Sequence, residues 1–353
     1  MISRDFYRKK RVFITGHTGF KGSWMCKLLT MLGAEVTGYG LEPPTSPSLF
    51  QLAQIEPTIH SICGDIRDLP CLTEALAESS PDIVIHMAAQ PIVRDSYADP
   101  VYTYETNVMG TVNLLEAVRK VKTVRSVVNV TTDKVYKNNE WEWGYRENDA
   151  LDGYDPYSNS KSCSELVTSS YTKSFFQGED APAISTCRAG NVIGGGDFAN
   201  DRIIPDCVRA MQSRRTIAVR NPYSTRPYQH VLEPVAAYLM VAERQYEDKA
   251  FAGAYNVGPD DCDCVETGAL VDLFCRAWGA DAKWENMAEA NAPHEASFLK
   301  LDCSRIKQVF GWNPRWHIGQ AVEKTVAWAK AWLDGEGPGG VMECQIEDYL
   351  GKA

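Results

Sequence analysis

The sequence contains no apolar stretch of the roughly 20 residues that a helix needs to span a bilayer. It also shows no signal peptide: segment 1–11 is basic, but the apolar run behind it, residues 12–15, is short and typical of a β-strand. A disulfide framework is missing as well, because the eleven cysteines are odd in number and scattered along the chain. These absences predict a cytoplasmic protein with reduced thiols.

Positive charge is scarce. The chain has 36 Lys and Arg against 46 Asp and Glu, a formal net charge of -10, which argues against a nucleic-acid partner. An anionic small molecule stays possible, since a local arginine cluster can bind one. Cys262 and Cys264 form the only close cysteine pair, and no further ligands follow at the spacing of a metal site. We therefore expect no nucleic acid, no membrane and no metal.

The first half of the chain alternates apolar strand patterns with helix patterns. This alternation predicts an α/β fold with a Rossmann-type, doubly wound parallel sheet. The expected strands are residues 11–15, 35–39, 59–63, 83–87, 126–131 and 183–188. The expected helices between them are residues 21–32, 69–78, 101–121 and 156–176.

The alternation ends after Gly190, where elements of mixed length follow. Later patterns predict a short strand at 254–257 and helices at 235–246, 266–278 and 318–332. We expect a smaller mixed α/β lobe to lie over the carboxyl edge of the sheet, where open α/β sheets bind ligands. The predicted division is a Rossmann domain over 1–190, to which 231–258 return, and a lobe over 191–230 and 259–353.

A glycine-rich turn joins the first expected strand to the first expected helix. Glycines at this place allow a tight turn, close approach of the backbone to a pyrophosphate, and close helix packing. The positive end of the helix would face the phosphates. The turn therefore predicts a bound dinucleotide, held by Gly16, Thr18, Gly19, Phe20, Lys21 and Gly22.

The second expected strand lacks the terminal acid that usually holds the ribose hydroxyls of NAD. Glu42 comes late, and no arginine stands there for a 2′-phosphate, so we expect NAD rather than NADP. Asp65 follows the third strand and either lies near the adenine or caps a helix. The fourth strand is followed by residues that would let a flat ring approach, Ala88, Ala89 and Gln90.

Two further motifs carry acid–base chemistry. Thr132, Asp133 and Lys134 close the fifth expected strand, and Tyr157 and Lys161 stand four residues apart, on one helix face. The ammonium group can favour the tyrosinate and bring a phenol pKa of about 10 toward neutrality. Such a phenolate is a general base for a hydroxyl group. The adjacent acid–base pair indicates chemistry beyond alcohol oxidation.

These motifs resemble the extended short-chain dehydrogenase/reductase superfamily over roughly the whole chain. The matching residues are Gly16, Gly19, Gly22, Asp65, Ile66, Ala88, Ala89, Asn107, Thr132, Tyr157 and Lys161. Within the superfamily, the sequence is similar to the CDP-glucose 4,6-dehydratases at residues 16–24, 131–136, 191–197 and 225–234. At 133–134 the dTDP-glucose dehydratases have Asp-Glu and the epimerases have small residues.

The resemblance implies NAD as cofactor and conversion of CDP-glucose to CDP-4-keto-6-deoxyglucose. Tyr157 would take the C4 hydroxyl proton as hydride leaves C4, with Thr132 bound to the same oxygen. The C4 ketone makes the C5 proton acidic, so water can leave across C5 and C6. Asp133 would protonate the C6 hydroxyl, and Lys134 would act at C5 as base or as stabilising cation. Hydride then returns to C6.

Arginines of the second half are candidates for the substrate diphosphate, because a guanidinium suits a bidentate grip on phosphate. They are Arg202, Arg220 and Arg226. Asn191 is expected to contact the sugar phosphate from its place in the family motif. Arg188 ends a strand and has a structural role as the alternative.

Two rival functions stay open. A nucleotide-sugar 4-epimerase would need Tyr157 and NAD but not the pair Asp133 and Lys134. A non-catalytic NAD-binding sensor of the same fold would need none of the acid–base residues. The resemblance also implies a homodimer or tetramer through helices 101–121 and 156–176, and a role in making deoxysugars for lipopolysaccharide. Nothing in the sequence alone identifies cytosine as the base.

Overall fold

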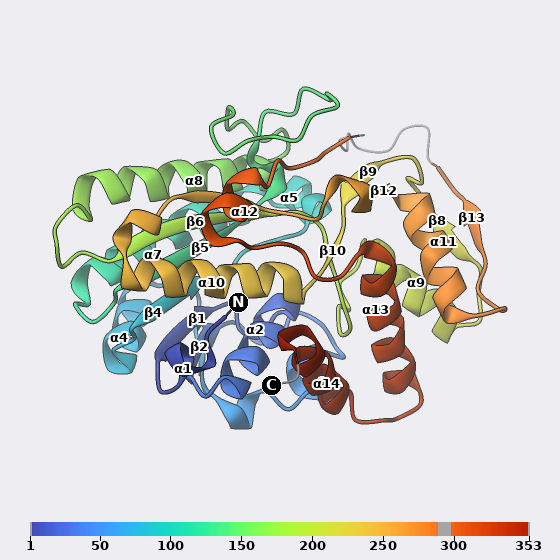
Figure 1. Cartoon of the computed structure of the whole chain (residues 1–353), viewed down its shortest axis with the longest axis horizontal. Coiled ribbons are helices and arrows are strands. Elements are labelled where there is room, and N and C mark those ends of the chain that lie inside the picture. Colours follow the sequence, from blue (N-terminus) through green and yellow to red (C-terminus); the bar gives the residue numbers. More distant parts are fainter. Residues whose placement is uncertain (1, 289–297, 352–353) are drawn as a thin grey trace.

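The computed structural model describes residues 2–288 and 298–351. A seven-stranded sheet lies at its centre in the order β11-β6-β5-β4-β1-β2-β3, and every pairing in it is parallel (Figure 1). The strands are β1 (Arg11–Thr15), β2 (Glu35–Gly40), β3 (His60–Cys63), β4 (Ile83–His86), β5 (Ser126–Thr132), β6 (Ala183–Ala189) and β11 (Ala254–Val257). The predicted Rossmann-type sheet is confirmed, with strand ends shifted by a residue.

Helices cover both faces of the sheet, which explains why the strands are continuous apolar runs. In β5, for example, Val127 packs into the core on one face and Val128 into the core on the other. The first face is covered by α4 (Leu69–Ser79), α7 (Gly110–Lys120) and α8 (Pro156–Phe175). The second face is covered by α2 (Phe20–Met31) and α10 (Leu232–Glu247).

The expected helix 101–121 consists of three consecutive pieces: α6 (Pro100–Tyr104), a π-helical turn η2 (Glu105–Met109) and α7. The π turn contains Asn107 and faces the cavity described below. Such turns are uncommon and occur often at functional sites. Shorter helices around the sheet are α1 (Arg4–Tyr7), α3 (Leu49–Leu52), α5 (Val93–Ala98) and α12 (Ser304–Phe310).

A smaller lobe lies at one end of the sheet, on the right of Figure 1, and has an apolar core of its own. Its helices are α9 (Ile203–Gln212), α11 (Thr267–Trp278) and α13 (Ile318–Leu333). Its short strands pair as β7 (Val192–Ile193) with β10 (Gln229–His230), β8 (Ile217–Val219) with β13 (Trp284–Asn286), and β9 (Thr225–Pro227) with β12 (Cys264–Glu266).

Two later segments pack with the Rossmann sheet. Helix α10 lies against β5 and β6, and β11 adds the edge strand beside β6. Helix α14 (Pro338–Leu350) buries Met342 and Ile346 in the same core as α2, although the sequence assigned 259–353 to the lobe. The exact division into domains stays a prediction.

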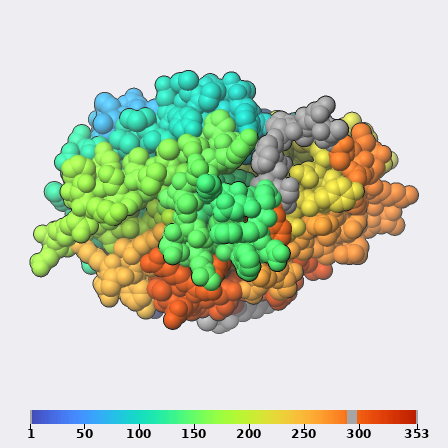
Figure 2. All heavy atoms as spheres, turned by 90° about the horizontal axis from the view of Figure 1, so that it is seen from above, coloured from blue at the N-terminus to red at the C-terminus, as the bar shows by residue number. Residues whose placement is uncertain are grey.

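The sheet order reverses at β1, whose neighbours are β2 and β4. Ligands of open α/β sheets bind at such a switch point, outside the carboxyl ends of the strands. Residues 137–154 pass over the neighbouring surface between α8 and the C-terminal part of the chain (Figure 2). Among the described residues, no helix combines the length and the apolar character that a membrane crossing requires.

Candidate active site

A cavity of about 1190 Å³ opens at the carboxyl ends of the strands and extends under the smaller lobe. It brings together residues from the glycine turn, the ends of β4 and β5, helix α8 and the lobe. Nearly all predicted site residues line it: Gly16, Thr18, Gly19, Phe20, Lys21, Gly22, Asp65, Ile66, Ala88, Ala89, Gln90, Thr132, Lys134, Tyr157, Lys161, Asn191, Arg202, Arg220 and Arg226. Asp133 and Asn107 are not part of its wall.

The glycine turn has the close contacts that its sequence predicts. Gly16 has a φ of +76°, and a Cβ atom there would lie 2.8 Å from Ala88 Cα. A Cβ atom on Gly22 would lie 2.2 Å from the Gly16 carbonyl oxygen, so α2 can approach the turn only with glycine there. Gly19 is the N-cap of α2 and offers no side-chain cap. The first backbone N–H groups of α2 are thus available to a phosphate, and the residues fit a dinucleotide.

Asn107 lies behind the cavity wall. Its side chain accepts a hydrogen bond from Gln90 N at 2.9 Å and donates to Gln90 O at 3.0 Å and Ser160 Oγ at 2.9 Å. Gln90 itself lines the cavity. Contact between Asn107 and a cofactor stays a prediction, but the residue fixes the backbone of one that borders the cofactor space.

Two acids, Asp65 and Glu42, line the cavity beside the ends of β2 and β3. Asp65 binds the Arg67 guanidinium at 2.7 Å, and these hydrogen bonds hold the pKa of Asp65 below its usual value. Asp68, rather than Asp65, caps α4, so Asp65 is not the helix cap that the sequence left open. Glu42 lies two residues beyond β2, yet it lines the cavity. Glu42 is therefore a candidate for the ribose-binding acid, which the sequence lacks at the end of the second strand.

Helix α8 places the Tyr157–Lys161 pair at the end of β5. Asp155 caps the helix by accepting a hydrogen bond from Ser158 N at 3.0 Å, and Pro156 occupies its first turn, as such residues favour. Lys161 Nζ donates to the Val130 carbonyl oxygen at 3.3 Å. Tyr157 and Lys161 are both surrounded by protein atoms and both line the cavity.

In the protein alone, Tyr157 does not have the low pKa that the sequence predicts, and its lowering by Lys161 beside a bound cofactor stays a prediction. Burial raises the pKa of Tyr157, while the charge of Lys134 and a hydrogen bond with Thr132 oppose the rise. Burial also lowers the pKa of Lys161 from 10.5 to about 8, against the charge of Glu165. The sequence missed this because it showed the spacing of the two groups but not the depth at which they lie.

Asp133 and Lys134 form a hydrogen-bonded unit with two neighbours. Lys134 Nζ donates to Asp133 Oδ1 at 3.0 Å and to Asn191 Oδ1 at 3.1 Å, and Thr132 Oγ1 donates to Asp133 Oδ1 at 3.0 Å. Asp133 is fully buried, and its Oδ2 atom has no hydrogen-bond partner within the described ranges. Lys134 is thus a tethered cation at the cavity, and Asp133 lies directly behind it.

Arginine–carboxylate pairs line the lobe side of the cavity. Arg202 pairs with Asp197 at 3.1 Å, and Arg220 pairs with Asp201 at 2.8 Å. Arg226 is buried in β9 and donates to the Thr225 carbonyl oxygen. All three predicted arginines therefore face one space, where they could bind a diphosphate.

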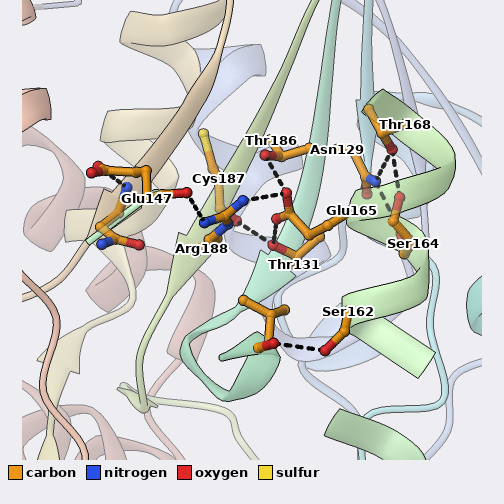
Figure 3. A network of polar contacts seen from close by, with 12 residues as sticks. Asn129, Thr131, Glu147, Ser162, Ser164, Glu165, Thr168, Thr186, Cys187 and Arg188 are labelled. Carbon is orange, nitrogen blue, oxygen red and sulfur yellow. Dashed lines mark hydrogen bonds and ion pairs between the residues drawn. The ribbon is translucent and has the colours of Figure 1, made fainter. Parts of the chain in front are cut away.

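Arg188 has structural partners, as the alternative interpretation predicted. It donates to Glu165 Oε2 at 2.9 Å, behind the end of β5 (Figure 3). It also donates to the Tyr136 hydroxyl at 2.9 Å. Glu165 was missed by the sequence reasoning, although its place four residues after Lys161 was a usable signal. Other cavity-lining residues were not named as site residues either. Asp197 and Tyr228 lie within the motif segments 191–197 and 225–234, whereas Arg94, Tyr97, Ser224 and Thr267 belong to no motif.

The loop with Cys262 gains one neighbour that its sequence did not reveal. His317 Nδ1 lies 2.8 Å from Asp263 Oδ2, and the ligand atoms of Cys262, Asp263 and His317 lie within 4.8 Å of one another. Asp263 also accepts a hydrogen bond from Ile318 N at the start of α13. These contacts give Asp263 a structural role, because it holds the first residues of α13.

The fold, the glycine turn and the Thr–Tyr–Lys arrangement define the class, an extended short-chain dehydrogenase/reductase. The family model described as GDP-mannose 4,6 dehydratase matches residues 13–325. The chain is 50% identical over 355 residues to the CDP-glucose 4,6-dehydratase of Salmonella typhimurium, with 99% of each chain covered. The chain therefore belongs to the GDP-mannose 4,6 dehydratase family.

Two solved structures show the same fold. One is a UDP-glucose-4-epimerase from Stenotrophomonas maltophila with bound NAD, with a TM-score of 0.80 and 20% identity over 92% of this chain and 99% of that one. The other is a dTDP-glucose 4,6-dehydratase from Bacillus anthracis in complex with NAD, with a TM-score of 0.75 and 21% identity over 93% and 99%. At these identities the likeness concerns the fold alone.

Proposed function

We propose that the protein is an NAD-dependent hydro-lyase that converts CDP-glucose to CDP-4-keto-6-deoxyglucose. The observation that carries this proposal is the 50% identity over 99% of both chains to a CDP-glucose 4,6-dehydratase. The geometry supports it independently, because Thr132, Tyr157, Lys161 and Lys134 all line one cavity beside the glycine turn. An epimerase would have no use for the acid–base pair of Asp133 and Lys134.

The cofactor would be held by the glycine turn, by Asp65 and Ile66, and by the segment after β4. When bound, NAD⁺ would supply the redox chemistry, as acceptor and then donor of the hydride that C4 loses and C6 gains. Glu42 is suited to the ribose hydroxyls and would repel a 2′-phosphate, which supports NAD over NADP.

Oxidation at C4 requires a base and a fixed hydroxyl group. Tyr157 accepts the C4 hydroxyl proton, and Thr132, with which it is hydrogen-bonded, orients the same oxygen. Lys161 places its ammonium group at the same edge of β5 and favours the phenolate once it forms.

Elimination of water needs an acid at C6 and charge stabilisation at C5. Once C4 is a ketone, loss of the C5 proton gives an enolate. The tethered Lys134 can stabilise the enolate as an ammonium cation or, as the neutral amine, take the C5 proton itself. We assign Asp133 as the source of the proton for the departing C6 hydroxyl. Because Asp133 has no exposed surface, Thr132 or Lys134, which both donate to its Oδ1, would give a proton to the departing hydroxyl and take one from Asp133 in return.

Substrate binding would use the lobe. Arg202, Arg220 and Arg226 provide guanidinium groups for the diphosphate, and Asn191 would contact the sugar phosphate. Asn191 also accepts a hydrogen bond from Lys134, so it connects the substrate region with the elimination residues. We infer the preference for cytosine from the similarity to the CDP-glucose 4,6-dehydratase, and we assign no residue to the base.

We also propose a homodimer through α6, α7 and α8. Val101 on α6, Leu166 on α8 and Met109 in the π turn η2 before α7 are large apolar side chains that are exposed. Figure 2 shows α8 and the cyan segments side by side on one surface. Multi-angle light scattering should give a dimer or larger for the native chain and a monomer for Val101→Glu with Leu166→Glu. A cytosolic location is consistent with the eleven free cysteines.

The test is a substrate panel of CDP-, UDP-, dTDP- and GDP-glucose with added NAD⁺. We expect a 4-keto-6-deoxy product, identified by NMR, and the highest kcat/KM with CDP-glucose. Formation of CDP-galactose without a keto product would instead identify an epimerase. If no sugar nucleotide gives a product or a transient NADH absorbance, the protein is a non-catalytic NAD-binding sensor.

A further inference from the structure

Glu165 is a buried carboxylate that the reaction scheme leaves without a role. It lies on α8, one turn after Lys161 and two turns after Tyr157, on the same helix face. Its Oε1 atom accepts a hydrogen bond from Thr131 at 2.5 Å, and its Oε2 atom accepts from Thr186 at 2.7 Å and from Arg188 at 2.9 Å (Figure 3). The carboxylate is therefore held from β5 and from β6 at once.

These contacts fasten α8 to the last residues of β5. Val130 O accepts from Lys161, Thr131 donates to Glu165, and Ser162 donates to Val135 O at 2.7 Å. The side chain next to Thr131 is Thr132, which points to the opposite face of the strand and lines the cavity. A fixed distance between β5 and α8 therefore fixes how Thr132 meets the phenol of Tyr157.

Glu165 also sets the charge around Lys161. The ionisable groups near this ammonium are Lys21 on α2, His86 on β4 and Tyr157 and Glu165 on α8. Burial lowers the pKa of Lys21 to about 7 and the pKa of His86 to about 3, so near pH 8 both side chains are mainly neutral. Glu165 is the acid whose charge favours the protonated form of Lys161.

We propose that Glu165 is a positioning residue of the active site, which keeps Lys161 protonated and holds Thr132 against Tyr157 without touching the substrate. Arg188 and Thr186 hold the carboxylate in place from β6. The electrostatic part of this inference concerns the protein alone, and the kinetic part rests on the proposed dehydratase function.

The first experiment needs no substrate. Protein labelled with ¹³C at lysine Cε is titrated by NMR, and the Lys161 resonance is assigned with Lys161→Met. We expect the native midpoint near pH 8 to fall by about one pH unit in Glu165→Gln, since loss of an opposite charge nearby has effects of this size. Glu165→Asp keeps the charge and should keep the native midpoint. An unchanged midpoint in Glu165→Gln overturns the electrostatic part.

Thr186→Val is the matched control. It removes a hydrogen bond to the same carboxylate but leaves the charge and the Thr131 contact in place. The Lys161 midpoint should therefore stay at the native value. A shift in this variant as large as in Glu165→Gln would show that any disturbance of the network moves Lys161, and would overturn the specific role of the charge.

The second experiment measures kcat and KM for CDP-glucose against pH. In Glu165→Gln we expect kcat to fall about tenfold near pH 8 and its alkaline decline to begin about one pH unit lower, with KM unchanged because the residue lies outside the cavity wall. A change in KM alone would overturn the positioning role. A native enzyme that makes no product contradicts the proposed function, while the NMR titration still decides the role of Glu165.

Glu165→Gln leaves Arg188 buried without its carboxylate, which can unfold the protein. The double variant Glu165→Gln with Arg188→Met removes both charges and is expected to fold, because replacing a whole buried pair is often neutral. Circular dichroism checks folding. The Lys161 midpoint should still fall in the double variant, and a native midpoint there would overturn the proposal.

Discussion

Two groups of arginine–carboxylate pairs flank the same cavity, and they differ in depth. The pair of Arg188 and Glu165 behind β5 is closed off, with side chains only 4% and 3% exposed. The pair of Arg220 and Asp201 on the lobe side is 36% and 33% exposed. Arg94 also reaches Asp201, at 3.5 Å, across from the Rossmann side.

The difference in exposure indicates that buried arginine–carboxylate pairs hold the active site in place, whereas exposed pairs can exchange their carboxylate for a substrate phosphate. Breaking a buried pair costs several kcal/mol because the remaining charge is left unpaired, so Glu165 and Arg188 can hold a fixed geometry. An exposed pair is worth about 1 kcal/mol or less, so a phosphate can replace the carboxylate at little cost. We therefore expect changes at the β5–α8 side to affect kcat and changes at the lobe side to affect KM.

The largest expected effect is at Tyr157. Tyr157→Phe removes the hydroxyl group that accepts the C4 proton but keeps the ring in the cavity wall. Turnover of CDP-glucose should fall by about 10³-fold or more, because the loss of a general base costs this much. Calorimetry should show that NAD⁺ and CDP-glucose still bind. Near-native turnover, or loss of substrate binding instead, would remove the distinction between the two sides of the cavity.

The burial of Lys161 on the β5–α8 side of the cavity can be tested by the pH dependence of protein stability. Burial lowers its pKa from 10.5 to about 8, so between these pH values the unfolded chain binds more protons than the folded one. The free energy of unfolding should therefore rise with pH in this window, by about 3 kcal/mol from this group. Lys161→Met should lack that rise. Urea unfolding at pH 8 and pH 10 measures the rise. An equal change in the free energy of unfolding for both proteins would contradict burial of the Lys161 charge.

The sequence predicted the sheet well because strands buried on both faces must be apolar over their whole length, as in residues 126–131. It also predicted Thr132, Tyr157 and Lys161 as one group, since four-residue spacing and a strand end are local features. The roles of these residues stay predictions. The lobe was harder, because strands of three residues such as β8 carry no periodicity.

Contacts between residues that are far apart in the chain could not be predicted from the sequence. Lys134 meets Asn191 and Thr131 meets Glu165, over separations of 57 and 34 residues. No local pattern encodes such a pairing, and only the folded chain brings the partners together. For the same reason the sequence did not reveal that the Asn107 side chain fixes the backbone of Gln90, while its contact with a cofactor stays a prediction.

A substitution at Lys134 tests whether oxidation at C4 and elimination of water can be separated. Lys134→Met should slow formation of the 4-keto-6-deoxy product about 100-fold, because an acid–base group is lost. Oxidation at C4 should persist, so NADH absorbance at the active site should accumulate with CDP-glucose. Exchange of the C5 hydrogen of a 4-keto substrate with solvent should be slow as well. Native exchange would mean that Lys134 takes no essential part at C5.

The smallest expected effect is on the lobe side. Arg220→Gln removes one exposed guanidinium that pairs with Asp201 and Asp206. KM for CDP-glucose should rise about tenfold while kcat stays within about threefold, as when an interaction common to ground state and transition state is lost. Because the site is exposed, raising the salt concentration should reduce the difference between the two proteins.

The matched control for this last change is Arg11→Gln. Arg11 pairs with Asp82 at 3.0 Å and is about as exposed as Arg220, but it lies at the amino end of β1, away from the cavity. Its loss should leave KM and its salt dependence unchanged. If both variants raise KM equally, the effect comes from net charge and not from a phosphate contact. If Arg220→Gln lowers kcat instead, the lobe arginines also position the reacting sugar, and the two sides of the cavity share one task.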